Sequence, residues 1–219
     1  MTPALQAFPS RDALMQAAAE RLAAALKTGL EQRGAACAAL SGGSTPGPAY
    51  ERLAAMPLDW ARVTFALVDE RCVPVEDGAS NEGLLRRALA PALAQGAHVL
   101  PMYAGLTSAD VADAAYATLH IDIALVGMGA DGHTASWFPG GDGLRAALDP
   151  RNTRTVVAVR APQAASVADR LTLTRAALDR ADSVLLLITG ADKRRRLDAA
   201  LTQKIEDAPV AALFARPER

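Results

Sequence analysis

Apolar positions along the chain follow two periods in turn, one typical of helices and one of strands. From Leu14 to Leu30 an apolar residue recurs at every fourth position, which predicts a helix with one buried face. Ser10 and Gly34 suit the two ends of this helix as capping residues. The continuous apolar run 35–40 then predicts a short buried strand.

The same alternation continues to the end of the chain. Further strands are predicted at 62–68, 98–102, 121–126, 155–159, 170–174 and 183–189. Further helices are predicted at 46–56, 80–89, 107–119, 144–149, 175–181 and from 191 onward. The strand 170–174 alternates polar and apolar residues, so we expect it to be half exposed. Alternating strands and helices predict an α/β fold with a mostly parallel sheet and helices on both faces.

Length and composition narrow the class of protein. A chain of 219 residues fits a single α/β domain over 1–219. A net charge of -1 argues against a nucleic-acid partner, and neither a membrane span nor a signal peptide is visible. Cys37 and Cys72 are expected to be free thiols in a reducing cytoplasm. The three histidines lack metal-binding spacing, so no metal is expected.

The stretch 121–140 carries the strongest indication of function. Its apolar run ends in a turn that contains three glycines together with Asp131 and His133. Ligands of open α/β sheets bind beyond the carboxyl ends of the strands. We therefore interpret this turn as part of an active site, with a structural turn and a solvent-facing histidine as the alternative.

The glycines of this turn also fit the pattern G-x-G-x-x-G of dinucleotide-binding folds. That pattern requires a helix directly after it and an acidic residue at the end of a second strand about 20 positions later. Here Phe138, Pro139 and Gly140 follow instead of a long helix, and Asp149 follows no strand. A nucleotide cofactor is therefore not expected.

The loop after the strand 35–40 carries residues suited to an anion. Gly42, Gly43, Ser44 and Thr45 lie between a strand and the helix predicted at Pro46, with Ser44 or Thr45 as its cap. Such a loop predicts a phosphate site, although a capped turn without a ligand is the alternative.

Charged residues follow the other strand ends. Asp69, Glu70 and Arg71 stand at the end of the strand 62–68, where the arginine could bind an anion and the carboxylates could orient it or move protons. Lys193 lies in the first turn of a helix that follows Gly190. The helix dipole disfavours a cation there, so we expect Lys193 to meet an anion.

Together the segments SGGSTP (41–46), DERCVP (69–74), GMGADGHTASWFPG (127–140) and RLTLT (170–174) resemble the family of glucosamine-6-phosphate isomerases and 6-phosphogluconolactonases. The resemblance spans nearly the whole chain. It implies a three-layer α/β/α sandwich with a Rossmann-like sheet and no cofactor. Its lactonase branch hydrolyses 6-phospho-D-glucono-1,5-lactone to 6-phosphogluconate, so the implied partner is a phosphosugar lactone. A monomer or weak homodimer is expected.

The resemblance also implies roles for individual residues. His133 would be the general base that activates water, with Asp131 beside it, and Asp69 and Arg71 would line the substrate site. Gly42, Gly43, Ser44 and Thr45 would bind the phosphate together with Lys193.

Two alternatives remain open. A deaminase of this family carries a glutamate just before its Pro-Gly, where this chain has Phe138. A non-catalytic sugar-phosphate sensor would have little use for His133.

Without a G-x-S-x-G motif, direct attack by water is expected rather than a covalent intermediate.

Overall fold

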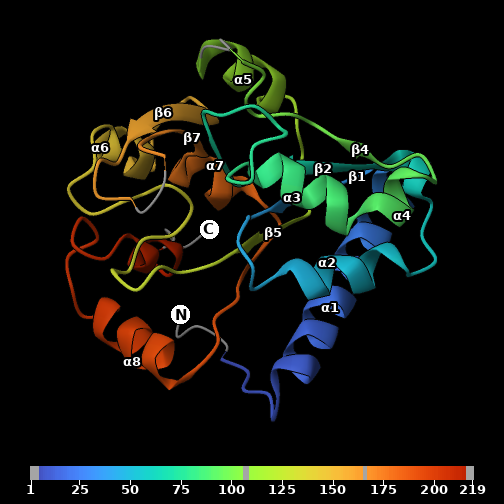
Figure 1. Ribbon diagram of the computed structural model, residues 1–219, viewed down its shortest axis with the longest axis horizontal. Coiled ribbons are helices and arrows are strands. Elements are labelled where there is room, and N and C mark those ends of the chain that lie inside the picture. Colours follow the sequence, from blue (N-terminus) through green and yellow to red (C-terminus); the bar gives the residue numbers. More distant parts are fainter. Residues whose placement is uncertain (1–4, 106–108, 165–166, 216–219) are drawn as a thin grey trace.

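The computed structural model describes residues 5–105, 109–164 and 167–215. Within them, five parallel strands form the central sheet (Figure 1). In order across the sheet these are β4 (His98–Val99), β2 (Val63–Leu67), β1 (Ala36–Leu40), β5 (Ile123–Val126) and β8 (Ser183–Leu186). The prediction of a mostly parallel sheet is confirmed for these strands, several of which end earlier than expected.

A second sheet was not anticipated. It consists of β3 (Asp69–Arg71), β7 (Asp169–Leu173) and β6 (Val156–Arg160), all antiparallel. Val68 joins the two sheets, because its N–H donates to Leu40 O at 3.0 Å and its carbonyl accepts from Leu173 N at 2.8 Å. The charged residues after the strand 62–68 therefore form a strand of their own that leaves the parallel sheet.

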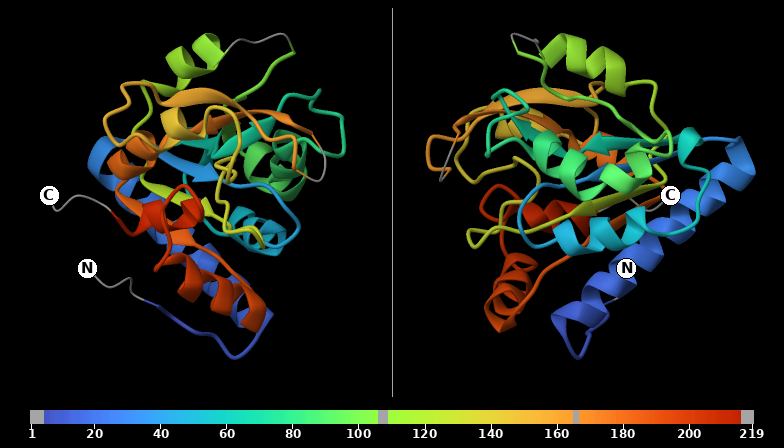
Figure 2. Two further views of the ribbon diagram at one scale, coloured as in Figure 1. Left: turned by 90° about the vertical axis from the view of Figure 1, so that its left-hand side faces the viewer. Right: turned by 45° about the vertical axis from the view of Figure 1, so that its right-hand side comes forward.

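Helices lie on both sides of these sheets. Their bounds are α1 (Arg11–Arg33), α2 (Gly47–Ala54), α3 (Asn81–Ala88), α4 (Ala90–Leu93), α5 (Ala109–Tyr116), α6 (Leu144–Leu148), α7 (Arg175–Arg180) and α8 (Ala191–Ala200), with short 3₁₀ turns η1 (Trp60–Arg62) and η2 (Pro209–Leu213). The views in Figures 1 and 2 agree that α1 lies on one side and α5 on the other. None of the helices in the described ranges combines the length and apolar character needed to cross a membrane.

The predicted ends of α1 are confirmed. Ser10 Oγ accepts from Ala13 N, and Gly34 ends the helix with φ 77°. That left-handed conformation suits glycine, which has no Cβ to clash with the backbone. The start predicted for the helix 107–119 falls on Thr107 and Ser108, which lie outside the described residues.

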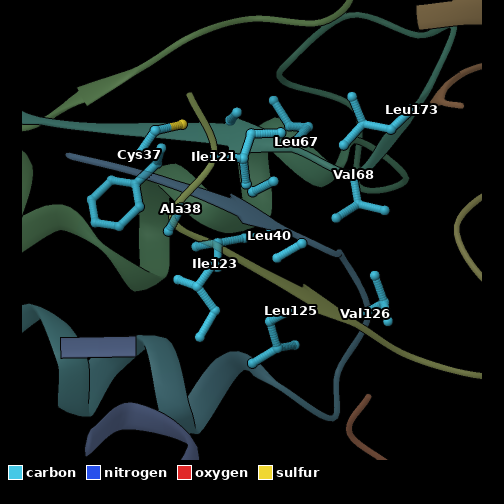
Figure 3. Close-up of a cluster of buried hydrophobic side chains, with 14 of the residues drawn as sticks. Cys37, Ala38, Leu40, Leu67, Val68, Ile121, Ile123, Leu125, Val126 and Leu173 are labelled. Atoms are coloured by element: carbon cyan, nitrogen blue, oxygen red, sulfur yellow. The ribbon is translucent and has the colours of Figure 1, made fainter. Parts of the chain in front are cut away.

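The main apolar core surrounds the central strands. All five residues of β1 and all four of β5 are buried, as parallel strands covered on both faces require. Figure 3 shows side chains of β1, β2 and β5 packed together, with Leu173 of the second sheet beside Val68. This packing places the carboxyl ends of β1, β2 and β5 at one edge, where the glycine-rich loops begin.

Glu70 connects the second sheet to α3. Its side chain is only 1% exposed, and it accepts hydrogen bonds from the N–H groups of Arg71, Asn81 and Glu82 and from the Ser80 hydroxyl. Burial raises the pKa of the Glu70 carboxyl, although these four donors act in the opposite direction. Glu70 is thus a structural member of the DER segment, and it fixes the start of α3.

Replacement of Glu70 should destabilise the fold. We expect Glu70→Ala to lower the free energy of unfolding by about 3 kcal/mol or more, because several buried donors lose their acceptor. Urea unfolding measures this change. The matched control is Glu76→Ala at an exposed position, and equal stability of the two variants would contradict the role assigned to Glu70.

Candidate active site

The turn after β5 is compact and depends on glycine. Gly129 N donates to His133 O at 2.8 Å, and Gly132 N donates to Gly129 O at 3.2 Å. A Cβ at Gly129 would lie 2.1 Å from His133 Nδ1, so no larger residue fits there with the histidine in place. Gly132 has φ 90°, which glycine adopts without strain. These glycines serve to fold the turn tightly around His133.

The turn holds His133 and Asp131 together. The His133 Nδ1 and Asp131 Oδ1 atoms are 2.6 Å apart, and the His133 N–H donates to the same oxygen at 3.1 Å. The His133 ring stacks on Phe138, with centroids 4.0 Å apart. An ionised carboxylate can only accept hydrogen bonds, so Nδ1 of His133 carries the ring proton and donates it to Asp131. The other ring nitrogen, Nε2, is then unprotonated and can take up a proton.

The same contacts act on Asp131. Burial raises the pKa of its carboxyl, but the hydrogen bonds from the His133 ring and backbone outweigh burial and lower the pKa to about 2. Asp131 therefore stays ionised at neutral pH, as a partner that orients the imidazole must.

A cavity of about 240 Å³ opens beside this pair, at the carboxyl ends of the central strands. Seven of the nine predicted site residues line it: Gly42, Gly43, Thr45, Asp69, Arg71, His133 and Lys193. Asp131 is not among its lining residues, because it contacts His133 on the Nδ1 side of the ring. The structure thus brings together residues that are up to 151 positions apart in the chain, from Gly42 to Lys193.

Ser44 differs from the prediction. Its side chain is exposed and is not among the lining residues, while its carbonyl accepts from Arg11 Nη2 at 3.2 Å. The predicted cap by Ser44 or Thr45 is wrong, since Pro46 occupies the N-cap of α2 and no side chain bonds there. Proline fits this position because its backbone has no N–H to satisfy. The Thr45 hydroxyl is therefore not engaged in capping, and Thr45 lines the cavity.

Arg170 is a site residue that the sequence analysis missed. It is 5% exposed, lines the cavity, lies 3.8 Å from Asp69 and sits 5.0 Å above the Phe138 ring. The expectation of a half-exposed strand was wrong here. The polar members of the alternation, Arg170 and Thr172, face neighbouring polar groups rather than water. A charged residue within that alternation was the signal available in the sequence.

Asp69 is held from several directions. Its carboxylate accepts from Ser136 Oγ, and its carbonyl accepts from Asn81 Nδ2 at 2.8 Å. Asn81, which also lines the cavity, was likewise missed, because the sequence shows it only as the residue after a helix cap. These contacts fix the Asp69 side chain beside Arg170.

The charge of the cavity is positive. Arg71, Arg170 and Lys193 line it, and Asp69 is the one carboxylate among its described lining residues. Lys193 Nζ donates to Met128 O at 2.7 Å, so the lysine meets a partial negative charge at the edge of the cavity. Burial lowers the pKa of the Arg170 guanidinium, and the charge of Asp69 opposes that change. A cavity lined by three cations and one carboxylate favours an anionic ligand.

A parallel α/β sheet with a histidine–aspartate pair and a cationic, glycine-rich cavity at its carboxyl edge defines an α/β enzyme that acts on an anionic small molecule. The model of the glucosamine-6-phosphate isomerase and 6-phosphogluconolactonase family matches residues 9–219, and the chain belongs to this family.

Individual relatives come from the lactonase branch. A 6-phosphogluconolactonase from Caulobacter vibrioides is 42% identical over 96% of this chain and 91% of its own length. One from Mesorhizobium japonicum is 41% identical over 89% and 84%. The crystal structure of a 6-phosphogluconolactonase from Shewanella baltica has a TM-score of 0.90 at 31% identity and covers 96% of this chain and 92% of that chain. These likenesses confirm the family that the four motifs indicated and the predicted α/β fold.

The Asp131–His133 contact should affect how the free energy of unfolding changes with pH in acid. Since the folded-state pKa of Asp131 is below the ordinary 3.8, its contribution is present above pH 3.8 and is lost as the pH falls toward about 2. Asp131→Asn should therefore be less stable than wild type above pH 3.8, with a difference that shrinks below it. Urea midpoints across this range measure the effect, which half-exposure keeps small. The exposed Asp207→Asn is the control, and a pH-independent difference for Asp131→Asn would contradict the assignment.

Proposed function

We propose that this protein hydrolyses 6-phospho-D-glucono-1,5-lactone to 6-phosphogluconate. One observation carries the proposal: a single cavity holds an oriented histidine base, His133, together with cations and a glycine loop suited to a phosphate. The names of the relatives and their coverage of nearly the whole chain support it.

In the proposed reaction, water is activated by His133. Its Nε2 removes a proton from water as the oxygen attacks the lactone carbonyl carbon, and Asp131 on Nδ1 stabilises the imidazolium that forms. A positioned base contributes about 10²- to 10⁴-fold to such a rate. The ring oxygen then leaves and takes the proton from the imidazolium, so the products are the hydroxy acid and the neutral base.

Charge on the carbonyl oxygen develops during the attack. Arg71 and Arg170 are cavity cations that could stabilise it, and Asp69 holds Arg170 in place. Cations already held in position stabilise the charge of the transition state most strongly where the surroundings exclude water. We therefore keep Asp69 and Arg71 in the proposed catalytic set, with Asp69 as a positioning group.

The phosphate is assigned to the glycine loop before α2 and to Lys193. Gly42, Gly43, Ser44 and Thr45 precede α2, whose N-terminal end carries partial positive charge. Ser44 contributes only its backbone in this proposal, because its side chain is exposed. Lys193 completes the phosphate site. Binding of this remote group orients the lactone against His133.

Phe138 distinguishes the lactonase from the deaminase of the same family. A deaminase moves a proton between carbon atoms and needs a further carboxylate near the histidine. Here the ring of Phe138 stacks on His133 and under Arg170, and it offers no acid or base. Phe138 therefore supplies no second proton-transfer group beside His133. A non-catalytic sensor would have no need of the oriented base.

The remaining parts of the proposal follow from the chemistry and from the sequence. The reaction needs no cofactor and no metal, since lactone hydrolysis requires only water, a base and charge stabilisation. We further propose that residues 1–219 act as one domain in the cytoplasm, as a monomer or weak homodimer, without nucleic-acid or membrane partners.

Loss of the base should reduce turnover. We expect His133→Ala to lower kcat by about 100-fold or more with KM little changed, because the variant still binds the lactone but cannot remove the proton. Decay of freshly generated 6-phospholactone, compared with its spontaneous hydrolysis, measures this. His98→Ala, an exposed histidine on β4, is the matched control.

Glucosamine 6-phosphate, with ammonia release as the readout, runs beside this assay. Ammonia without accelerated lactone decay would show a deaminase instead. Near-normal kcat in His133→Ala would remove this histidine from the mechanism.

Loss of the phosphate contacts should weaken binding. We expect Lys193→Ala and Thr45→Val to raise KM by about 10-fold or more with a smaller effect on kcat. In our proposal the native lysine and threonine bind the phosphate, which does not take part in the reaction. Ser44→Ala is the control in the same loop, with little change expected because its hydroxyl lies outside the cavity. A KM unchanged in both cavity variants would place the phosphate elsewhere.

A further inference from the structure

We propose that Arg196 is a positioning residue that holds the turn of Asp131 and His133 against α8, and that α8 thereby links the phosphate end of the site to the base. This inference rests on the proposed function. It concerns a residue outside the cavity lining, on the helix that carries Lys193.

Two cations of α8 bind the two sides of the same turn. Lys193 Nζ donates to Met128 O at 2.7 Å, and Arg196 Nη2 donates to Asp131 O. Residues three positions apart lie on one face of a helix, so both contacts come from the same face of α8. The carbonyls that they bind bracket the segment that positions His133. The position of α8 and the conformation of this turn therefore depend on each other.

The fit around the Arg196 guanidinium is close. A Cβ at Gly132 would lie 2.6 Å from Arg196 Nη2, so the glycine at this position also makes room for the arginine. Arg196 Nη1 donates to Gln203 Oε1 at 2.8 Å, which fixes the other side of the fork. Both ends of the guanidinium are thus committed, one of them to the backbone of the catalytic turn.

A small apolar cluster supports this arrangement. It is separate from the main core and consists of Met128, Leu197, Ala200, Ala208 and Val210. Val210 N also donates to Gly132 O at 3.0 Å, which ties η2 to the same turn. Helix α8 and η2 therefore pack against the catalytic turn as one unit, and Figure 1 shows α8 set apart from the labelled helices around the central sheet.

Neighbouring arginines on α8 do something different. Arg194 pairs with Asp198 and Arg195 pairs with Asp192, both within the helix and at exposed positions. Arg196 is partly buried and reaches Asp131, 65 positions away in the chain. The run of three arginines therefore contains one residue with a tertiary role, and Arg195 provides a natural control.

The link to the phosphate follows from the position of Lys193. Its ammonium lies at the cavity edge and uses one of its three N–H donors for Met128 O, so the other two can bind a phosphate while the lysine still contacts the turn. A response of Lys193 to phosphate is transmitted through α8 to Arg196, and from there to the carbonyl of Asp131. In this way occupancy of the phosphate site bears on the placement of the base.

The test compares Arg196→Gln, Arg196→Lys and Arg195→Gln on the 6-phospholactone. We expect Arg196→Gln to lower kcat by about 10- to 100-fold with KM within about twofold of wild type, because a base displaced by a fraction of an ångström removes the proton from water poorly. Arg196→Lys should restore part of the loss, since lysine can still donate to Asp131 O. Arg195→Gln should match wild type. Thermal midpoints separate a local effect from general unfolding.

A second measurement tests the link itself. Glucono-1,5-lactone without phosphate is hydrolysed with and without added inorganic phosphite, which can occupy the phosphate site in trans. We expect phosphite to accelerate the wild type and Arg195→Gln but not Arg196→Gln. Equal activation of Arg196→Gln, or no activation of the wild type, would overturn the link.

The outcomes distinguish this inference from the function on which it rests. An active wild type with unchanged kcat in a folded Arg196→Gln would overturn the positioning role alone. A wild type that does not accelerate decay of the 6-phospholactone would refute the proposed function, and the inference with it.

Discussion

Parallel strands that end at one edge are the constraint on which the site depends. Because β1, β2 and β5 run side by side in the same direction, the loops that follow them open at the same edge of the sheet. A fully buried core keeps these ends in register. The glycine loop 42–45, the DER segment and the turn that carries His133 come from distant parts of the sequence, and the common direction of these strands brings them to one cavity.

The second sheet adds what the parallel sheet cannot supply. β3 leaves the central sheet after Val68 and pairs with β7, which places Asp69 beside Arg170. Glu70, on the same short strand, accepts four hydrogen bonds and anchors the start of α3. Adjacent carboxylates of one tripeptide therefore have different tasks: Asp69 orients a cavity cation, and Glu70 stabilises the fold.

The role that we propose for His133 depends on the residues that surround it. Asp131 fixes the tautomer of His133, and Phe138 covers one face of its ring. Glycine at 129 leaves space for the His133 ring, which a Cβ at that position would occupy. In our proposals the backbone of the same turn is held by α8, so the groups that bind phosphate and the group that activates water belong to one connected structure.

The sequence by itself determined the local elements and indicated most of the predicted residues that meet at the cavity. Helical and strand periods, the glycines, and the placement of Asp131, His133 and Lys193 after apolar runs are local properties. They predicted the central sheet and, together with the family resemblance, a set of nine site residues of which seven line the cavity. Tertiary structure decided the rest. Only strand pairing shows that the polar side of β7 faces the site, which turns Arg170 from a surface residue into a cavity cation. Likewise the exposure of Ser44 and the reach of Arg196 depend on contacts between segments far apart in the chain, which local patterns do not encode.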